Sequence, residues 1–227
     1  MNTTEKFGNN ARIKLKVCGM KFENNIAEVG DLAPDYMGFI FYEKSPRNFT
    51  GKLPFLPPSI QKVGVFVAAP ITEVVQTVLA YDLQVVQLHG EEDPQYCQAL
   101  RNALKKVSNK TAIFKVFSIK DQFDFSRLIP FEQQCDYFLF DTKGPLPGGN
   151  GYEFDWTILQ DYPSSKPFLL SGGIGRASQE KLEAFFNSSA ATFCHAIDVN
   201  SQFETTPGCK TVAQLKKFKT ALVTMGL

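Results

Sequence analysis

The sequence predicts a closed (β/α)8 barrel, the TIM-barrel architecture of α/β proteins, and three observations predict it. Short apolar runs recur eight times along the chain, at intervals of roughly 20 to 30 residues, the length that a strand, a crossover helix and a loop require. The runs are apolar at nearly every position, as expected for strands buried on both faces. The chain has 227 residues, 44% hydrophobic and 21% charged, enough for one well-buried core but few for two.

A doubly wound open sheet is the alternative architecture for alternating strands and helices. It usually contains fewer strands, and the first apolar run is followed by Cys18-Gly19-Met20 rather than by the Gly-x-Gly-x-x-Gly fingerprint of dinucleotide-binding sheets. A single barrel domain is therefore expected over residues 13–227. The polar residues 1–12 are expected to form a disordered or frayed tail.

Each of the eight runs is predicted to be a parallel strand, because most are too short for helices and rich in β-branched or aromatic residues. In chain order the runs are Ile13–Val17, Tyr36–Phe41, Lys62–Val67, Gln84–Leu88, Ala112–Phe117, Asp136–Phe140, Pro167–Ser171 and Thr192–Val199.

Apolar residues at helical spacing predict helices between these runs. The predicted helices are Ile71–Tyr81, Pro94–Lys106, Phe154–Tyr162, Ser178–Phe186 and Thr211–Leu222. Thr72 is expected to cap the first of them, and Asp93, which precedes Pro94, is expected to cap the second. The second crossover, Gly51–Pro58, contains three prolines and should be an irregular turn or a stunted helix.

The charge balance excludes several classes of partner. Lys plus Arg number 24 against 23 Asp plus Glu, a formal charge of +1, so no global field would hold the chain on nucleic acid or on an anionic membrane. No apolar run approaches the roughly 18 residues of a membrane-spanning helix, and the first dozen residues lack the apolar core of a signal peptide. We therefore expect a cytoplasmic protein, in which any anionic partner is bound by local groups rather than by the overall charge. For the oligomeric state, the sequence is compatible with both a monomer and a homodimer.

The five cysteines are an odd number and contain no Cys-x-x-Cys pair. They predict free thiols rather than a disulfide framework or a zinc site. Two histidines far apart in sequence, without a carboxylate cluster, give no metal site of any other kind. His195 lies inside the eighth run and is interpreted as a core or barrel–helix interface residue.

In a (β/α)8 barrel the catalytic groups lie at the carboxyl ends of the strands. The residues that follow each run are therefore the candidates for a functional site. They are Cys18, Arg47, His89, Asp141, Gly172, Gly173, Asp198, Asn200 and Ser201.

The ends of the last two strands predict a phosphate site. Ser171-Gly172-Gly173-Ile174-Gly175 lets the backbone approach an anion, and Asp198-Val199-Asn200-Ser201 adds short polar side chains. Barrels of this class often bind phosphate at the loops after strands seven and eight. The competing interpretation is a pair of tight turns.

The remaining candidates carry proton-transfer or recognition chemistry. Cys18 closes the first strand and could point into the barrel mouth, although free cysteines are more often simply buried. Asp141 ends the sixth strand, where partial desolvation could raise its proton affinity. The competing interpretation is that it caps the following turn. Arg47 has a planar guanidinium that could bind a carboxylate, although a lone loop arginine is more often solvated. His89 could reach a substrate.

These residues stand in blocks that together resemble the phosphoribosylanthranilate isomerase family over nearly the whole chain from Lys14 onward. The blocks are Lys16-Val17-Cys18-Gly19-Met20, Gly38-Phe39-Ile40-Phe41-Tyr42 with Ser45-Pro46-Arg47, Val63-Gly64-Val65-Phe66-Val67, Val86-Gln87-Leu88-His89-Gly90, Phe140-Asp141-Thr142-Lys143 with Gly148-Gly149-Asn150-Gly151, Phe154-Asp155-Trp156, Leu170-Ser171-Gly172-Gly173-Ile174 and Asp198-Val199-Asn200-Ser201. The resemblance implies a barrel enzyme of tryptophan biosynthesis that performs a cofactor-free Amadori rearrangement.

The resemblance also implies residue roles. Cys18 would be the general base and Asp141 the general acid, Arg47 would face the anthranilate carboxylate, and the phosphate would lie on the backbone and side chains of Gly172, Gly173 and Ser201. Three positions depart from the family pattern, namely Asn150, Gln202 and the Pro207-Gly208-Cys209-Lys210 segment. They concern phosphate contact and loop closure and leave the two catalytic positions unchanged.

Further expectations concern the chemistry. Cys18 is expected to react as a thiolate, with Lys16 a poor helper unless its amine is tolerated inside the barrel. The glycine-rich segment Thr142–Tyr152 is expected to form a mobile lid. The alternatives are another phosphosugar barrel, such as an indole-glycerol-phosphate synthase or a ribulose-phosphate epimerase, and a non-catalytic phosphosugar-binding barrel.

Overall fold

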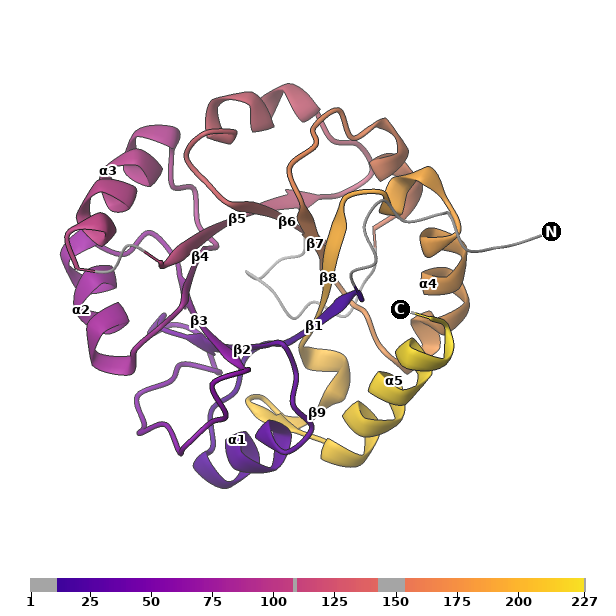
Figure 1. Cartoon of the computed structure of the whole chain (residues 1–227), viewed down its shortest axis with the longest axis horizontal. Coiled ribbons are helices and arrows are strands. Elements are labelled where there is room, and N and C mark those ends of the chain that lie inside the picture. The colour runs from indigo at the N-terminus through magenta and orange to yellow at the C-terminus, as the bar shows by residue number, and fades with distance from the viewer. Residues whose placement is uncertain (1–11, 108–109, 143–153, 227) are drawn as a thin grey trace.

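Eight parallel strands close into a barrel in sequence order, with β1 paired to both β2 and β8 (Figure 1). The computed structural model describes residues 12–107, 110–142 and 154–226. The strands are β1 (Lys14–Val17), β2 (Tyr36–Ile40), β3 (Gln61–Phe66), β4 (Val85–Leu88), β5 (Ala112–Ile119), β6 (Tyr137–Thr142), β7 (Phe168–Leu170) and β8 (Cys194–Val199). All eight predicted strands are present, with each end within two residues of its predicted position. The predicted fold class is therefore confirmed.

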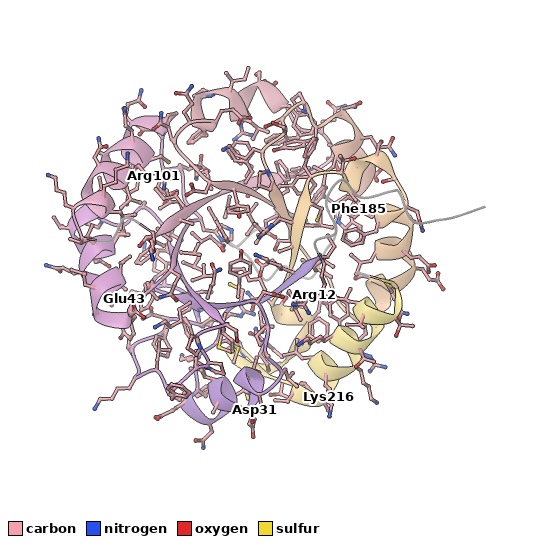
Figure 2. All side chains as sticks on the ribbon, viewed as in Figure 1. Arg12, Asp31, Glu43, Arg101, Phe185 and Lys216 are labelled. Atoms are coloured by element: carbon pink, nitrogen blue, oxygen red, sulfur yellow. The ribbon has the colours of Figure 1, made fainter. Side chains whose placement is uncertain are left out.

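Helices form a ring outside the barrel (Figure 1). They are α1 (Glu23–Gly30), α2 (Ile71–Tyr81), α3 (Pro94–Lys105), α4 (Gln179–Phe186) and α5 (Val212–Thr224). On α5, Leu215, Phe218 and Leu222 are buried, whereas Lys216, labelled in Figure 2, is exposed. The sequence analysis assigned no range to α1, whose buried apolar side chains are only Ile26 and Val29.

The two predicted caps have different outcomes. Asp93 accepts a hydrogen bond from the Tyr96 backbone N–H at 2.6 Å, so the predicted cap of α3 is confirmed. The expectation that Thr72 caps α2 is wrong. The helix begins at Ile71 directly after Pro70, whose extended backbone precedes the first turn, and no side chain caps it.

The crossovers after β2, β5 and β6 contain no α-helix among their described residues. In the segment after β2 the prolines prevent one, as predicted. After β5 the chain forms the 3-10 helix η1 (Phe125–Phe131), which contains Pro130. The predicted helix Phe154–Tyr162 is wrong. The segment is the 3-10 helix η2 (Trp156–Asp161), because Asp155 caps it and Pro163 stops it before an α-helix can propagate.

Short elements flank the last two strands. The 3-10 helices η3 (Arg176–Ser178) and η4 (Ser189–Ala191) flank α4, and η4 explains why β8 begins later than predicted. After β8 come the 3-10 helix η5 (Ser201–Phe203) and a hairpin of β9 (Glu204–Thr206) and β10 (Cys209–Lys210).

Side chains fill the interior of the barrel (Figure 2). An apolar layer that includes Tyr36, Phe114, Leu139 and Leu169 occupies the inside, and a second, larger core lies between the strands and the surrounding helices. His195 Nε2 lies 2.9 Å from the hydroxyl of Tyr36, at the amino ends of the strands, in agreement with its interpretation as a structural residue.

Arg12, which the sequence analysis placed in the tail, donates to Asp35 Oδ1 at 2.7 Å. Residues 1–11 lie outside the described residues. Among the described helices, none combines the length and apolar character needed to cross a membrane. The five cysteines are free thiols, and the described residues contain no group of three metal-ligating side chains.

Candidate active site

All nine candidate residues line one cavity at the carboxyl ends of the strands. The cavity is also lined by side chains that the sequence analysis did not select, among them Tyr42, Ser45, Gln87 and Gln202. The strand-end rule brings the candidates together because every parallel strand ends at the same rim. Their individual roles stay predictions.

Cys18 lies at the end of β1 beside a buried ion pair. Lys16 Nζ donates to Asp198 Oδ1 at 3.0 Å, and both side chains are almost fully buried. Lys16 and Cys18 are two residues apart on one strand and therefore project to the same side. Lys16 and Asp198 are register partners across the β1–β8 pair, so the three groups meet inside the barrel.

The electrostatics of this cluster correct one expectation. Burial raises the pKa of the Cys18 thiol, and the neighbouring Lys16 only partly opposes that effect. The thiol is therefore the major form in the ligand-free protein, rather than the expected thiolate. Burial alone would lower the pKa of Lys16, but Asp198 and Cys18 outweigh it and raise that pKa. Lys16 thus stays an ammonium inside the barrel, which is the condition under which it was expected to help Cys18.

Asp141 lies at the end of β6 and faces His89 at the end of β4. His89 Nε2 is 3.4 Å from Asp141 Oδ2, and the Thr142 N–H donates to Asp141 Oδ1 at 3.0 Å. On the other side of the imidazole, Gln87 Nε2 is 3.5 Å from His89 Nδ1. Gln87 Oε1 is buried and has no hydrogen-bond partner within the described chain, which leaves one acceptor in the cavity wall.

Residues 171–174 after β7 and 200–201 after β8 line the cavity together, and we call them the anion loop after their predicted role. Gly172 and Gly173 have φ values of +95° and +70°, in the left-handed region that favours glycine. A Cβ on Gly172 would overlap the Thr142 hydroxyl and lie 2.6 Å from the Thr142 nitrogen. The glycine is therefore required for the close approach of the β7 end to the β6 end, beside Asp141.

Replacing Gly172 by alanine is expected to lower the free energy of unfolding by about 2–4 kcal/mol, since positive φ and overpacking both penalise a Cβ. Urea denaturation measures this change. Gly226→Ala is the matched control, because Gly226 also has positive φ but nothing lies within 4 Å of its Cβ position. It should cost about 1 kcal/mol or less. Equal losses in the two variants would show that the contact with Thr142 is unimportant.

Arg47 reaches the cavity from the loop after β2 and is paired to the hairpin after β8. Its Nε donates to Glu204 Oε1 at 2.9 Å, and its Nη2 donates to Glu204 Oε2 at 2.7 Å. Lys210 Nζ donates to Glu204 Oε1 at 2.6 Å and to Asn200 Oδ1 at 2.6 Å. Arg47 is therefore fixed by contacts rather than solvated.

Sequence reasoning missed three polar residues of this region, namely Gln87, Glu204 and Lys210. The two-residue alternation along β4 could have indicated Gln87, which shares a face with His89. Glu204 and Lys210 come from a hairpin after the last strand, which the strand-end rule does not address. The expected lid, Thr142–Tyr152, lies outside the described residues except for Thr142.

Comparisons with known proteins agree with this geometry. The sequence model of the N-(5'-phosphoribosyl)anthranilate (PRA) isomerase family matches residues 15–221. The N-(5'-phosphoribosyl)anthranilate isomerase of Parabacteroides distasonis is 40% identical over 211 residues, which cover 90% of each chain. A crystal structure of phosphoribosyl anthranilate isomerase from Thermotoga maritima superposes with a TM-score of 0.74 and is 27% identical, covering 95% of this chain and 100% of that chain.

A further crystal structure of a phosphoribosyl anthranilate isomerase holds reduced 1-(o-carboxyphenylamino)-1-deoxyribulose 5-phosphate. It is 26% identical with a TM-score of 0.70, and the match covers 95% of this chain and 100% of that chain. Sequence and architecture thus agree over nearly the full length of the relatives. The chain belongs to the phosphoribosylanthranilate isomerase family.

Proposed function

We propose that the protein converts N-(5-phosphoribosyl)anthranilate to 1-(2-carboxyphenylamino)-1-deoxyribulose 5-phosphate, an aldose–ketose isomerisation of tryptophan biosynthesis. Membership of the isomerase family supports the proposal. The observation that carries it is that the Cys18 thiol and the Asp141 carboxyl line the same cavity as Arg47 and the glycine-rich end of β7. The reaction needs no cofactor, because the anilino nitrogen of the substrate can delocalise the developing charge.

Asp141 is the proposed general acid. Its carboxyl proton passes to the ribose ring oxygen, the bond from C1 to that oxygen breaks, and the nitrogen lone pair forms a protonated Schiff base at C1. The contacts from His89 and from the Thr142 N–H orient the carboxyl group. The acid therefore stands at a fixed position in the cavity wall before substrate arrives.

Cys18 is the proposed general base. Its thiolate removes the proton from C2, the C2–H electron pair forms the C1=C2 bond, and the C=N pair returns to nitrogen to give an enolamine. Burial makes the thiolate the minor form in the ligand-free protein, and the Lys16 ammonium increases its population. The positive Schiff base favours the thiolate further. Ring opening is therefore expected to precede removal of the C2 proton.

Return of the two protons completes the cycle. The Cys18 thiol gives its proton to C1, while the proton of the C2 hydroxyl passes to the Asp141 carboxylate and leaves a ketone at C2. The base is then again a thiolate and the acid again a carboxylic acid. The product has the same atoms as the substrate, with the C1–O ring bond broken, a ketone formed at C2 and the protons redistributed, as an isomerisation requires.

Substrate recognition is proposed for the rest of the cavity. Arg47 faces the anthranilate carboxylate, because a guanidinium can bind a carboxylate through two parallel N–H bonds. Gly172, Gly173, Asn200 and Ser201 receive the phosphate. A relative binds the reduced product analogue, a molecule with both anionic groups, which supports binding of such a molecule by this chain.

The decisive experiment supplies freshly prepared phosphoribosylanthranilate to the purified protein, with and without a chelator, and follows formation of the ketose. Conversion that survives the chelator is the expected result. Binding of the reduced product analogue without conversion would instead indicate a non-catalytic phosphosugar-binding barrel. Failure of both binding and conversion would direct attention to other phosphosugar substrates.

A further inference from the structure

We propose that Glu204 is a positioning residue that orients the Arg47 guanidinium toward the substrate carboxylate and connects it to the anion loop. The inference rests on the proposed function, since it assigns that carboxylate to Arg47.

The geometry of the Arg47–Glu204 pair leaves part of the guanidinium available. Glu204 occupies the side of the fork made by Nε and Nη2, with contacts of 2.9 and 2.7 Å. The N–H groups of Nη1 and the second N–H of Nη2 have no partner among the described residues, and Arg47 lines the cavity. A planar guanidinium can bind one carboxylate on its side and another on its end. Glu204 thus fixes the plane of the guanidinium and leaves its Nη1–Nη2 end available for a substrate carboxylate.

Glu204 is itself held rigidly. Its side chain is buried, and Oε1 accepts hydrogen bonds from the Gly208 N–H at 3.0 Å and from Lys210 Nζ at 2.6 Å. Burial alone would raise the pKa of Glu204, but the contacts with Arg47 and Lys210 outweigh it and lower that pKa. The residue is therefore a carboxylate, whose Oε1 is fixed by the β9–β10 hairpin and whose Oε2 accepts from Arg47.

Lys210 extends the network to the anion loop. Besides Glu204, its ammonium contacts the Asn200 carbonyl oxygen at 3.2 Å and the Asn200 Oδ1 at 2.6 Å. The backbone of Lys210 is fixed in turn by Asn25 of α1, through contacts of 2.6 and 2.9 Å. The same pair, Glu204 and Lys210, therefore holds both Arg47, which is proposed to bind the carboxylate, and Asn200, which is proposed to bind the phosphate.

The charges explain why a carboxylate is tolerated next to a site for an anion. Arg47 and Lys210 are cations and Glu204 is one anion, so the group keeps a net positive charge. Burial lowers the pKa of Lys210 to about 8 even beside Glu204, so without Glu204 the ammonium would lose its proton more readily and the long arginine side chain would lose its fixed orientation. Glu204 thus keeps Lys210 an ammonium without cancelling the attraction for the substrate.

A double-mutant cycle with Glu204→Gln and Arg47→Ala tests the proposal, with calorimetric binding of the reduced product analogue and steady-state kinetics as readouts. Glu204→Gln is expected to raise both Kd and KM about tenfold or more, with kcat changed less than about threefold, since the lost contact concerns binding. In the Arg47→Ala background, the same substitution should weaken binding clearly less than in the wild-type background, since only the support of Asn200 through Lys210 is then lost. Glu204→Asp, which keeps the charge but withdraws the carboxylate, is measured in the same cycle in case the glutamine variant does not fold.

Asp35→Asn is the control, because Asp35 pairs with Arg12 at 2.7 Å at the opposite end of the barrel. It should leave Kd, KM and kcat unchanged. An unaltered affinity in both Glu204 variants, or an equal loss with and without Arg47, would overturn the proposal. Wild-type protein that binds the analogue without turning over phosphoribosylanthranilate would contradict the proposed function alone, and the binding cycle would still decide the role of Glu204. Wild-type protein that does not bind the analogue would contradict both.

Discussion

Replacing Asp141 by asparagine is expected to lower kcat by about 10²–10⁴-fold, the usual contribution of a general acid or base. The amide has nearly the shape of the carboxyl group, and its oxygen can still accept from the Thr142 N–H, but it has no acidic proton for the ring oxygen. The variant should therefore fold and bind the reduced product analogue within a few-fold of the wild-type affinity. Steady-state kinetics with phosphoribosylanthranilate and calorimetric binding measure the two quantities.

The control for this substitution is Asp136→Asn. Asp136 immediately precedes β6 and pairs with Arg101 at 2.7 Å, at the opposite end of the strand from Asp141. This variant should keep its kcat and lose only a modest amount of stability. If Asp141→Asn retains kcat within about threefold, another group must open the ribose ring.

Replacing Cys18 by serine is expected to reduce kcat by a similar factor, about 10²–10⁴-fold. A serine hydroxyl is a far weaker acid than a thiol, so the Lys16 ammonium cannot produce a useful population of its anion. The smaller oxygen leaves the contacts of the buried cluster largely in place. Kinetics and thermal unfolding together separate loss of the base from loss of the fold.

Cys194→Ser provides a matched control in the same barrel. Cys194 is a buried thiol outside the cavity, and its Sγ lies 3.7 Å from the Ala196 carbonyl oxygen. A serine hydroxyl can donate to that same oxygen, so this variant should fold and retain normal turnover. Loss of activity in both variants would indicate that any serine in the core disturbs the barrel, and normal turnover in Cys18→Ser would remove Cys18 from the mechanism.

The arrangement of the candidate residues was predictable because it depends on one rule of the fold. Parallel strands in a closed barrel all end at the same rim, so residues as distant in sequence as Cys18 and Asp141 can be placed at one cavity without knowledge of their contacts. The same periodic patterns gave the strands and α2, where apolar positions are frequent. They failed at Phe154–Tyr162, where a short segment bounded by Pro163 forms a 3-10 helix instead.

The charge partners were not predictable in this way. Lys16 and Asp198 are 182 residues apart, and no local pattern indicates that a lysine inside a barrel has a counterion. Glu204 pairs with Arg47 across 157 residues and stands on a hairpin that follows the last strand. Because burial and charge pairing decide the protonation of Cys18, its form in the ligand-free protein follows only from the assembled structure.

The pairing of β1 with β8 affects how the protein folds during its synthesis. The sulfur at position 18 and the ammonium at position 16 are synthesised with the first strand of the barrel, whereas the carboxylate that neutralises the ammonium is synthesised with the eighth. An ammonium without a counterion is costly to bury. The first strand therefore cannot be buried in its final position during translation until the eighth strand has been synthesised. We therefore expect incomplete chains to be inactive even when seven strands have formed. The isomerase should become active only in the final step of folding.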